Sequence, residues 1–231
     1  MTMHLSNIDA KFDGSLSFHK KADLRDVAPR GFYRSVFKQV LDVFLIVVTA
    51  PLTLPIIALL AMLVALNGGK PFYSQFRVGQ NGKLFRMWKL RTMVRDAETR
   101  LAAHLDADPE AFREWTATQK LKNDPRITRF GRLLRKTSLD ELPQLLNVLN
   151  GSMSLVGPRP MMVGQQCLYD GHSYYNLRPG ITGLWQISDR NDCNFSDRVR
   201  FDDAYDKDVS LGTDLKIIAK TVSVVLRGTG Y

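Results

Sequence analysis

The feature that most constrains this chain is an uncharged stretch of 24 residues from Val43 to Leu66, VFLIVVTAPLTLPIIALLAMLVAL. About 20 apolar residues suffice for a helix to cross the ~30 Å hydrocarbon core of a bilayer. The stretch begins too far from the N-terminus, and is too long, to be a signal peptide. A buried core helix is the alternative, but core helices of this length seldom lack a polar face. We therefore expect a membrane segment.

Two prolines, Pro51 and Pro55, lie near the middle of this stretch. Each removes a backbone hydrogen bond and clashes with the preceding turn, so a bend or break is expected there. Residues 1–42 carry seven Lys/Arg against five Asp, and residues 70–95 carry seven Lys/Arg and no acid. A spanning helix normally has excess positive charge on its cytoplasmic side alone. Basic flanks on both sides therefore predict a re-entrant helix that returns to the same side, with a straight or tilted span as the alternative.

The bulk composition limits the remaining choices. The 231 residues are enough for one domain with a real core, and a net charge of +9 favours nucleic acid, an anionic membrane surface or phosphorylated substrates as partners. Neither cysteine, Cys167 or Cys193, lies in a CxxC motif or near a histidine at ligand spacing. A disulfide framework and a zinc site are therefore not expected.

The stretch 124–160 contains an adjacent carboxylate pair, Asp140 and Glu141, followed by the rigid turn Gly157–Pro160. Five cations precede the pair: Arg126, Arg129, Arg132, Arg135 and Lys136. Two acids beside this many cations suit a site that handles phosphate, either as a nucleophile or through a metal. A solvated helix face of mixed charge is the alternative.

The local pattern around the pair predicts the start of a helix. Ser138 and Glu141 have the spacing of a capping box, and Gly151 supplies a stop, although Pro143 is awkward in this register. A row of leucines follows on one helical face: Leu139, Leu142, Leu145, Leu146 and Leu149. The two carboxylates would then lie in the first turn, where the helix dipole lowers a carboxylate pKa.

Other segments are read from turn signals and periodicity. Residues 70–94 predict a β-hairpin around Gly79–Gly82, because Asn-Gly is a strong turn signal. Residues 96–121 predict a helix with Asp96 as a candidate N-cap and an interruption at Pro109.

Two further helical segments are expected. Residues 126–136 form a basic amphipathic stripe suited to an anionic membrane, with an ordinary surface helix as the alternative. Residues 198–227 predict an amphipathic helix. The turns 157–160 and 178–186 combine arginine with glycines that allow close approach to a ligand, while Trp185 is expected to fill core rather than to stack a base.

Six short stretches that follow the hydrophobic segment resemble, in their order, the bacterial sugar transferase family. They are Phe76–Gly79, Lys89–Met93, Asn123–Arg126, Thr137–Gln144, Ser154–Pro160 and Pro179–Gly183. Each is weak alone, but the ordered set is highly specific and covers about residues 32–230. The chain is most similar to the small monotopic polyprenol-phosphate phosphoglycosyl transferases that start exopolysaccharide repeat units.

The resemblance implies an α+β, mainly helical fold with a re-entrant helix-break-helix membrane anchor, a compact cytosolic catalytic domain and a small β-hairpin. Residues 1–31 would be a flexible tail, residues 32–68 the re-entrant helix, and residues 69–231 the catalytic domain on the cytosolic face of the bacterial inner membrane. The break in the family is commonly Ser-Pro, whereas here it is Ala50-Pro51. Thr49 and Thr53 are then the hydroxyls placed to satisfy the freed carbonyls.

The activity implied by the resemblance is transfer of a hexose 1-phosphate, with galactose or glucose as the sugar, from a UDP-sugar to undecaprenyl (polyprenol) phosphate. Asp140 would attack the phosphate that bears the sugar, UMP would leave, and the phosphosugar-aspartyl intermediate would react with the lipid phosphate. Glu141 would help to hold a metal or handle a proton, and Mg²⁺ would bridge carboxylate and diphosphate. The expected substrate-binding residues are Lys89, Arg91, Arg135, Pro158, Arg159, Gly180 and Thr182.

Three other functions are weighed against this one. A non-enzymatic membrane-anchored adaptor that binds anionic lipid or a partner protein would show no nucleotide dependence. A nucleic-acid-binding protein fits the charge, but the carboxylate pair and the apolar segment argue against it. A multi-span phosphoglycosyl transferase cannot be built from one hydrophobic segment. A homodimer is left open.

Overall fold

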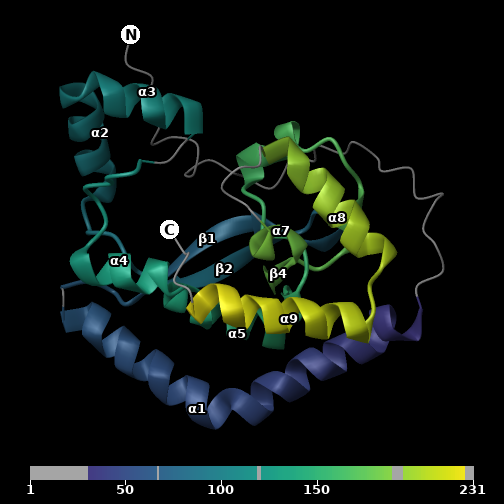
Figure 1. The fold of residues 1–231 in the computed structure, drawn as a ribbon. Coiled ribbons are helices and arrows are strands. Elements are labelled where there is room, and N and C mark those ends of the chain that lie inside the picture. Colours follow the sequence, from purple (N-terminus) through teal and green to yellow (C-terminus); the bar gives the residue numbers. More distant parts are fainter. Residues whose placement is uncertain (1–30, 67, 119–120, 189–194, 227–231) are drawn as a thin grey trace. The chain divides into compact units, whose positions relative to one another are not determined.

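The computed structural model describes residues 31–66, 68–118, 121–188 and 195–226. The described chain is mainly helical with two small two-stranded sheets, so the α+β fold is confirmed at that level (Figure 1). The predicted tail lies outside the described residues, apart from Gly31.

The apolar segment forms one bent helix. A short π-helical stretch, Tyr33–Phe37, leads into α1, Lys38–Leu66, and both prolines lie inside α1. Figure 1 shows α1 sharply bent near its middle, as proline predicts. The combined 34-residue helix is long and apolar enough to cross a membrane, and only 6% of its most apolar 18-residue window is buried in the protein. That exposure argues against the alternative of a buried core helix.

Both arms of α1 pack on the same folded unit. In the first arm, Ile46 joins a core cluster with Met87 and Val148. In the second arm, Ala61 and Val64 pack with Leu90 and Leu134. The helix therefore folds back at its bend, so that its two arms contact the same unit.

Thr49, near the bend, does not act as predicted. Prolines at positions 51 and 55 free the carbonyls four residues earlier, those of Val47 and Pro51. The Thr49 hydroxyl instead donates to the carbonyls of Leu45, at 2.8 Å, and Ile46, at 3.3 Å. Such back-bonding commonly bends helices, so Thr49 supports the bend without satisfying a freed carbonyl.

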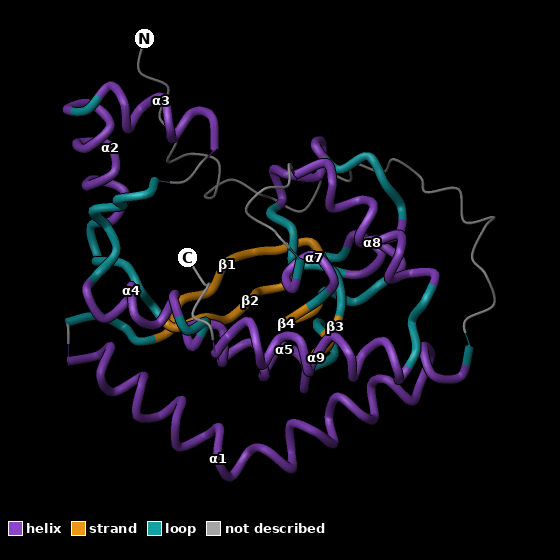
Figure 2. The backbone as a smooth tube through the Cα atoms, viewed as in Figure 1, coloured by secondary structure: helices purple, strands orange, loops and turns teal. Residues whose placement is uncertain are grey.

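The predicted hairpin is confirmed. Strands β1, Phe72–Val78, and β2, Leu84–Leu90, pair antiparallel with Val78 opposite Leu84 and Phe72 opposite Leu90 (Figure 2). The turn uses positive φ at Asn81 (57°) and Gly82 (74°), which explains the Asn-Gly pair.

The segment after the hairpin divides as Pro109 requires, into α2, Ala97–Ala107, and α3, Pro109–Thr118. Asp96 occupies the N-cap position of α2, as predicted, but its carboxylate makes no cap hydrogen bond and instead accepts from Arg100 Nε at 2.8 Å. Asp108 instead accepts from the backbone N–H of Glu110 at 2.9 Å and thereby caps α3.

The basic stripe 126–136 contains α4, Arg129–Lys136, which is capped where the Thr128 hydroxyl accepts from the Gly131 N–H at 2.9 Å. After the carboxylate turn come α5, Leu145–Leu149, and strand β3, Ser154–Val156. Short helices α6, Ser173–Asn176, and α7, Leu184–Ile187, flank strand β4, Gly180–Thr182. The predicted helical segment 198–227 is confirmed as helical, and it divides into two helices, α8, Arg198–Lys207, and α9, Leu211–Leu226.

Strands β3 and β4 pair in parallel, with Ser154 opposite Gly180 and Val156 opposite Thr182. The glycines of the two motifs allow the backbones of these segments to approach each other closely. A Cβ added at Gly180 would lie 2.1 Å from the Gly157 nitrogen, and one at Gly183 would lie 2.0 Å from the Gly157 oxygen. Close approach of the two turns to each other explains these glycines.

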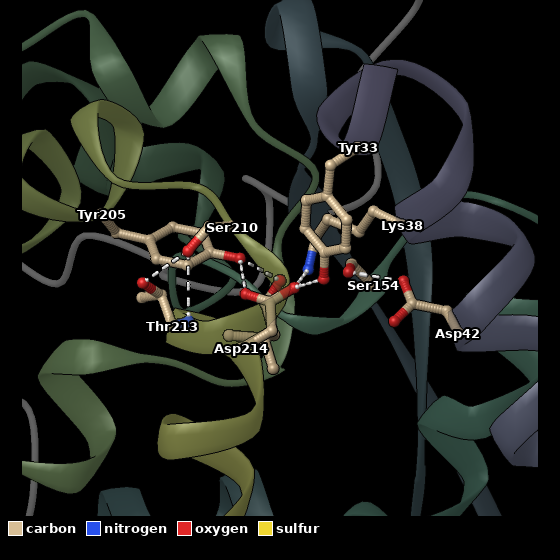
Figure 3. A network of polar contacts seen from close by, with 9 residues as sticks. Tyr33, Lys38, Asp42, Ser154, Tyr205, Ser210, Thr213 and Asp214 are labelled. Atoms are coloured by element: carbon tan, nitrogen blue, oxygen red, sulfur yellow. Dashed lines mark hydrogen bonds and ion pairs between the residues drawn. The ribbon is translucent and has the colours of Figure 1, made fainter. Parts of the chain in front are cut away.

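A buried polar network joins the first arm of α1 to the rest of the fold (Figure 3). Asp214 of α9 pairs with Lys38 and accepts from the hydroxyls of Tyr33 and Tyr205, each at 2.6 Å. Ser154 of β3 donates to Asp42 at 2.6 Å. Lys38, Asp42 and Asp214 are each at most 5% exposed, so removing one partner would leave another charge buried and unpaired. The network therefore specifies where the first arm is held.

We predict that Gly180→Ala destabilises the protein by about 2 kcal/mol or more, because the new methyl group would overlap backbone atoms that cannot move independently. Gly212→Ala is the matched control. Gly212 lies in α9 with open space around it, so alanine should be neutral or stabilise the protein by up to ~1 kcal/mol. Denaturant unfolding of both variants checks this, and equal stabilities would contradict the close-packing explanation.

Candidate active site

The carboxylate pair lies in a tight turn rather than at the start of an α-helix. Residues Leu139–Gln144 form a 3₁₀ helix, and α5 begins only at Leu145. The predicted capping box is wrong: Ser138 makes no side-chain cap and adopts a left-handed conformation, with φ of 57°. Pro143 is the physical reason, since it has no N–H to give the carbonyl of residue 139 in a regular α-helix.

Strain accompanies this geometry. A non-glycine residue in the left-handed region costs on the order of 1–2 kcal/mol and is found where the surroundings enforce it, often beside functional residues. Here the strained residue, Ser138, lies two positions before Asp140. The turn presents both carboxylates to strand β2, against which this 3₁₀ helix packs.

Asp140 is buried, with 7% of the residue exposed. Burial raises the pKa of its carboxyl group above the usual value, and the neighbouring Glu141 adds to this, whereas Lys89 and Arg135 act in the opposite direction. The expectation that a helix dipole lowers this pKa is therefore wrong, because the turn removes the helix start and desolvation dominates.

Three of the predicted cations surround the pair. Lys89 Nζ lies 2.6 Å from Glu141 Oε1 and 3.9 Å from Asp140 Oδ2. Arg159 Nη2 lies 3.9 Å from the same Glu141 oxygen. Arg135 is oriented by the Thr92 hydroxyl, which accepts from its Nε at 2.9 Å, and is close enough to Asp140 to lower its pKa. The result is a partly buried cluster. Its two acids lie in the 3₁₀ helix, and its three cations come from β2, α4 and the turn after β3.

The other cations of the basic stripe do not join the cluster. Arg126 forms a bidentate pair with Asp124, at 2.6 to 3.1 Å, and lies 5.0 Å from the Trp115 ring centre. Arg129, Arg132 and Lys136 are exposed. Helical periodicity therefore turns Arg135 alone of the five toward the carboxylates.

Four predicted substrate-binding residues have other neighbours. Arg91 lines a cavity of about 250 Å³ beside Gly68, Gly69 and Arg95 at the end of α1. The Pro158 carbonyl accepts from the Gly180 N–H at 2.8 Å, and the Thr182 hydroxyl shares a 2.7 Å hydrogen bond with Thr221 of α9. Pro158, Gly180 and Thr182 thus build the backbone support for the turn that carries Arg159.

A fourth basic residue, which the sequence motifs include without a predicted role, also lies near the two carboxylates. Arg77 of β1 is 8% exposed, and burial, followed by the nearby Arg159, lowers its pKa to about 10. Glu141 acts on it in the opposite direction. The strand pairing was the available signal, because Arg77 and Lys89 project from the same face of the hairpin.

The carboxylate pair is the candidate metal-binding feature. Within the described residues, no group of three or more His, Cys, Asp or Glu side chains could hold a metal ion. Two carboxylates fit Mg²⁺, which is usually bound through one or two carboxylates together with substrate phosphates. Asp140 and Glu141 supply that donor set.

Comparison with known proteins identifies the family. Residues 33–228 match the description "Bacterial sugar transferase". The chain is 49% identical over 181 residues to a UDP-galactose-lipid carrier transferase of Erwinia amylovora, covering 78% of this chain and 38% of that protein. It is 46% identical over 201 residues to an undecaprenyl-phosphate galactose phosphotransferase of Salmonella typhimurium, covering 86% and 41%.

A shorter relative matches along most of both chains. The exopolysaccharide production protein ExoY of Rhizobium meliloti is 45% identical over 196 residues, which are 84% of this chain and 87% of that protein. The chain thus spans about two fifths of the two longer relatives and most of the shorter one. The match over residues 33–228 shows that this chain belongs to the bacterial sugar transferase family.

Proposed function

We propose that the protein is a phosphoglycosyl transferase that moves a hexose 1-phosphate from a UDP-sugar to undecaprenyl phosphate and releases UMP. The observation that carries the proposal is the buried Asp140 carboxylate, held within 3.9 Å of Lys89 and beside Glu141 and Arg135. The names of the relatives support the reaction class and galactose as the first sugar to test. The name of the shorter relative supports a role in starting exopolysaccharide assembly.

The proposed reaction uses a buried carboxylate, which water solvates poorly, as its nucleophile. An Asp140 oxygen attacks the phosphorus that bears the sugar, the bond from that phosphorus to the UMP oxygen breaks, and UMP leaves with the electron pair. A phosphate oxygen of the polyprenol phosphate then attacks the same phosphorus, and the Asp140 carboxylate leaves. The products are polyprenol diphosphate sugar and free enzyme. Burial raises the pKa of the carboxyl group and so makes the carboxylate a stronger base, whereas Lys89 and Arg135 favour its ionised form.

The cations have a second role in both steps. Lys89 and Arg159 flank Glu141 and are placed to neutralise charge on the transferred phosphoryl group and the leaving phosphate. Mg²⁺ bound by Asp140 and Glu141 would supply further charge neutralisation at the diphosphate.

We also propose that α1 is a re-entrant anchor that holds the site at the cytosolic face of the inner membrane. Two observations support this arrangement: both arms of α1 pack on one unit, and the surface of its apolar middle is exposed. A bent helix with both ends on one side can enter a single leaflet and return. The lipid substrate carries its phosphate at that leaflet surface, and sugar nucleotides are cytosolic.

Asp140→Asn is expected to lower lipid-dependent UMP release by about three orders of magnitude or more, since it removes the nucleophile. The assay uses detergent-solubilised protein with Mg²⁺, a panel of UDP-sugars, and polyprenol phosphate present or omitted. The variant should fold with an unchanged or higher melting temperature at pH 7: a folded-state pKa above the unfolded value means that the ionised form is destabilised by folding. Wild-type rates in the variant would exclude the covalent mechanism, and no release from any donor would favour the adaptor.

The pH dependence of kcat/KM should follow the ionisation of the Asp140 carboxyl group. Activity requires the ionised carboxylate, so kcat/KM falls as the pH drops through its pKa, which burial places above the ordinary value. Lys89→Gln removes the main group that lowers this pKa, so the acid limb should move to higher pH. Lys83→Gln, at an exposed position in the hairpin turn, is the control. A limb that stays in place in Lys89→Gln would show that Asp140 does not set it.

The topology is tested by cysteine labelling at both ends of α1. Ser35→Cys and Lys70→Cys, each in a background without Cys167 and Cys193, lie at exposed positions before and after the apolar stretch. Both should react with an impermeant maleimide in inverted vesicles and neither in intact spheroplasts. Labelling of one site from each side of the membrane would show a spanning helix instead.

A further inference from the structure

The described residues contain few buried side-chain atoms without a hydrogen-bond partner, and three of the four residues that carry them are neighbours of Arg159. The atoms are Arg77 Nε, Trp185 Nε1, Arg198 Nε and both amide atoms of Gln186. Buried polar groups are nearly always paired, so each exception calls for an explanation. The unpartnered N–H groups of Arg77, Trp185 and Arg198 around Arg159 indicate a surface built to meet a polar ligand.

Contacts connect these residues through Arg159. The Arg159 and Arg198 guanidinium carbons lie 5.9 Å and 5.4 Å from the Trp185 ring centre. Arg198 also donates to the Arg159 carbonyl, and Arg159 is the charged neighbour that most lowers the pKa of Arg77. Trp185, which the sequence predicted to fill core, is therefore half-buried and lies against two arginines.

Strand pairing aims Arg77 at the site. Residues directly opposite in an antiparallel pair share a face, and faces alternate along each strand. Tyr73 lies opposite Lys89 and Arg77 opposite Phe85, so Arg77 and Lys89 extend from the same face of the hairpin. Lys89 reaches Glu141 from that face, and Glu141 is also the carboxylate whose charge acts on Arg77.

The charges around the carboxylates do not balance. Lys89, Arg135, Arg159 and Arg77 are four cations against the two carboxylates of Asp140 and Glu141, which leaves a formal excess of two positive charges. Among the described residues, the Arg77 side chain donates one hydrogen bond, from Nη2 to Gln75 Oε1 at 2.8 Å, and this acceptor is a neutral amide. Arg77 is buried and Arg159 is partly exposed, and two neighbouring guanidiniums that repel each other are stabilised when an anion lies between them.

We propose that Arg77 and Arg159 form a two-arginine clamp for a phosphate anion, and that its occupant is the diphosphate of the nucleotide-sugar donor. The choice of this occupant rests on the proposed function. A diphosphate diester carries two negative charges, which equals the excess of the site. The lipid phosphate shares the same chemistry, and separate kinetic arms distinguish the two sources.

Binding is tested with inorganic pyrophosphate as the probe, on the full chain in detergent and without Mg²⁺. Pyrophosphate should raise the melting temperature of wild type and of Arg86→Gln, an exposed arginine on the same hairpin, to the same extent. Arg77→Gln and Arg77→Met should lose most of the shift, although their unliganded melting temperatures stay within a few degrees of wild type. A full shift in either folded Arg77 variant, or no shift in wild type, overturns the proposal.

Kinetic measurements distinguish which substrate phosphate binds in the two-arginine clamp. In UMP-release assays, Arg77→Gln should raise KM for the UDP-sugar about 10- to 100-fold, the size expected for losing a charged hydrogen bond, with the KM for polyprenol phosphate unchanged. A rise confined to the lipid KM overturns the donor assignment. The clamp and the proposed function can fail separately. If Arg77→Gln releases UMP robustly with a normal KM for the UDP-sugar, the clamp alone is refuted. If pyrophosphate raises the melting temperature in an Arg77-dependent way but no donor releases UMP, the proposed function alone is refuted.

Discussion

The rest of the structure depends on the proline-determined bend in α1. Because the helix turns back on itself, both arms can pack on one unit, and each arm supports a different part of the site. The second arm contacts Leu90 and Leu134, the immediate neighbours of Lys89 and Arg135. The first arm packs through Ile46 on Met87, two residues before Lys89. The apolar helix is therefore also the platform on which the site cations are positioned.

The buried network at Asp214 keeps the first arm in place. A buried ion pair contributes little net stability compared with apolar packing, but it penalises any arrangement in which one partner is left alone. With Lys38, Tyr33 and Tyr205 all directed at one carboxylate, α9 and α1 have one satisfactory relative position. The Ser154–Asp42 hydrogen bond extends this restraint to β3, which leads into the turn that carries Arg159.

Electrostatics at the site reflect a balance between burial and charge. Desolvation raises the pKa of the Asp140 carboxyl group, whereas Lys89 and Arg135 act to lower it. Together they give a carboxylate with a raised pKa that remains next to Lys89 at 3.9 Å. The buried carboxylate lies in the 3₁₀ turn, two residues after the strained Ser138.

Sequence patterns predicted those features that depend on neighbouring residues. The Asn81-Gly82 turn set the hairpin, and the prolines set the bend and the division at Pro109. They failed where a local signal competed with another constraint. Ser138 and Glu141 have capping-box spacing, but Pro143 prevents the α-helix that the box would begin. Asp96 has the character of a cap, but Arg100 takes its carboxylate.

What the sequence by itself determined is therefore the elements, the motifs and the carboxylate pair, since these follow from periodicity, turn chemistry and composition. The tertiary structure decided how the basic residues are arranged around that pair. The family motifs pointed to Lys89, Arg135, Arg159 and Arg91, but Arg91 lines a cavity at the end of α1, and the buried Arg77 of β1 joins the site instead. The physical reason is that burial and pKa depend on contacts between residues far apart in the chain, which form only when α1 and the hairpin pack together.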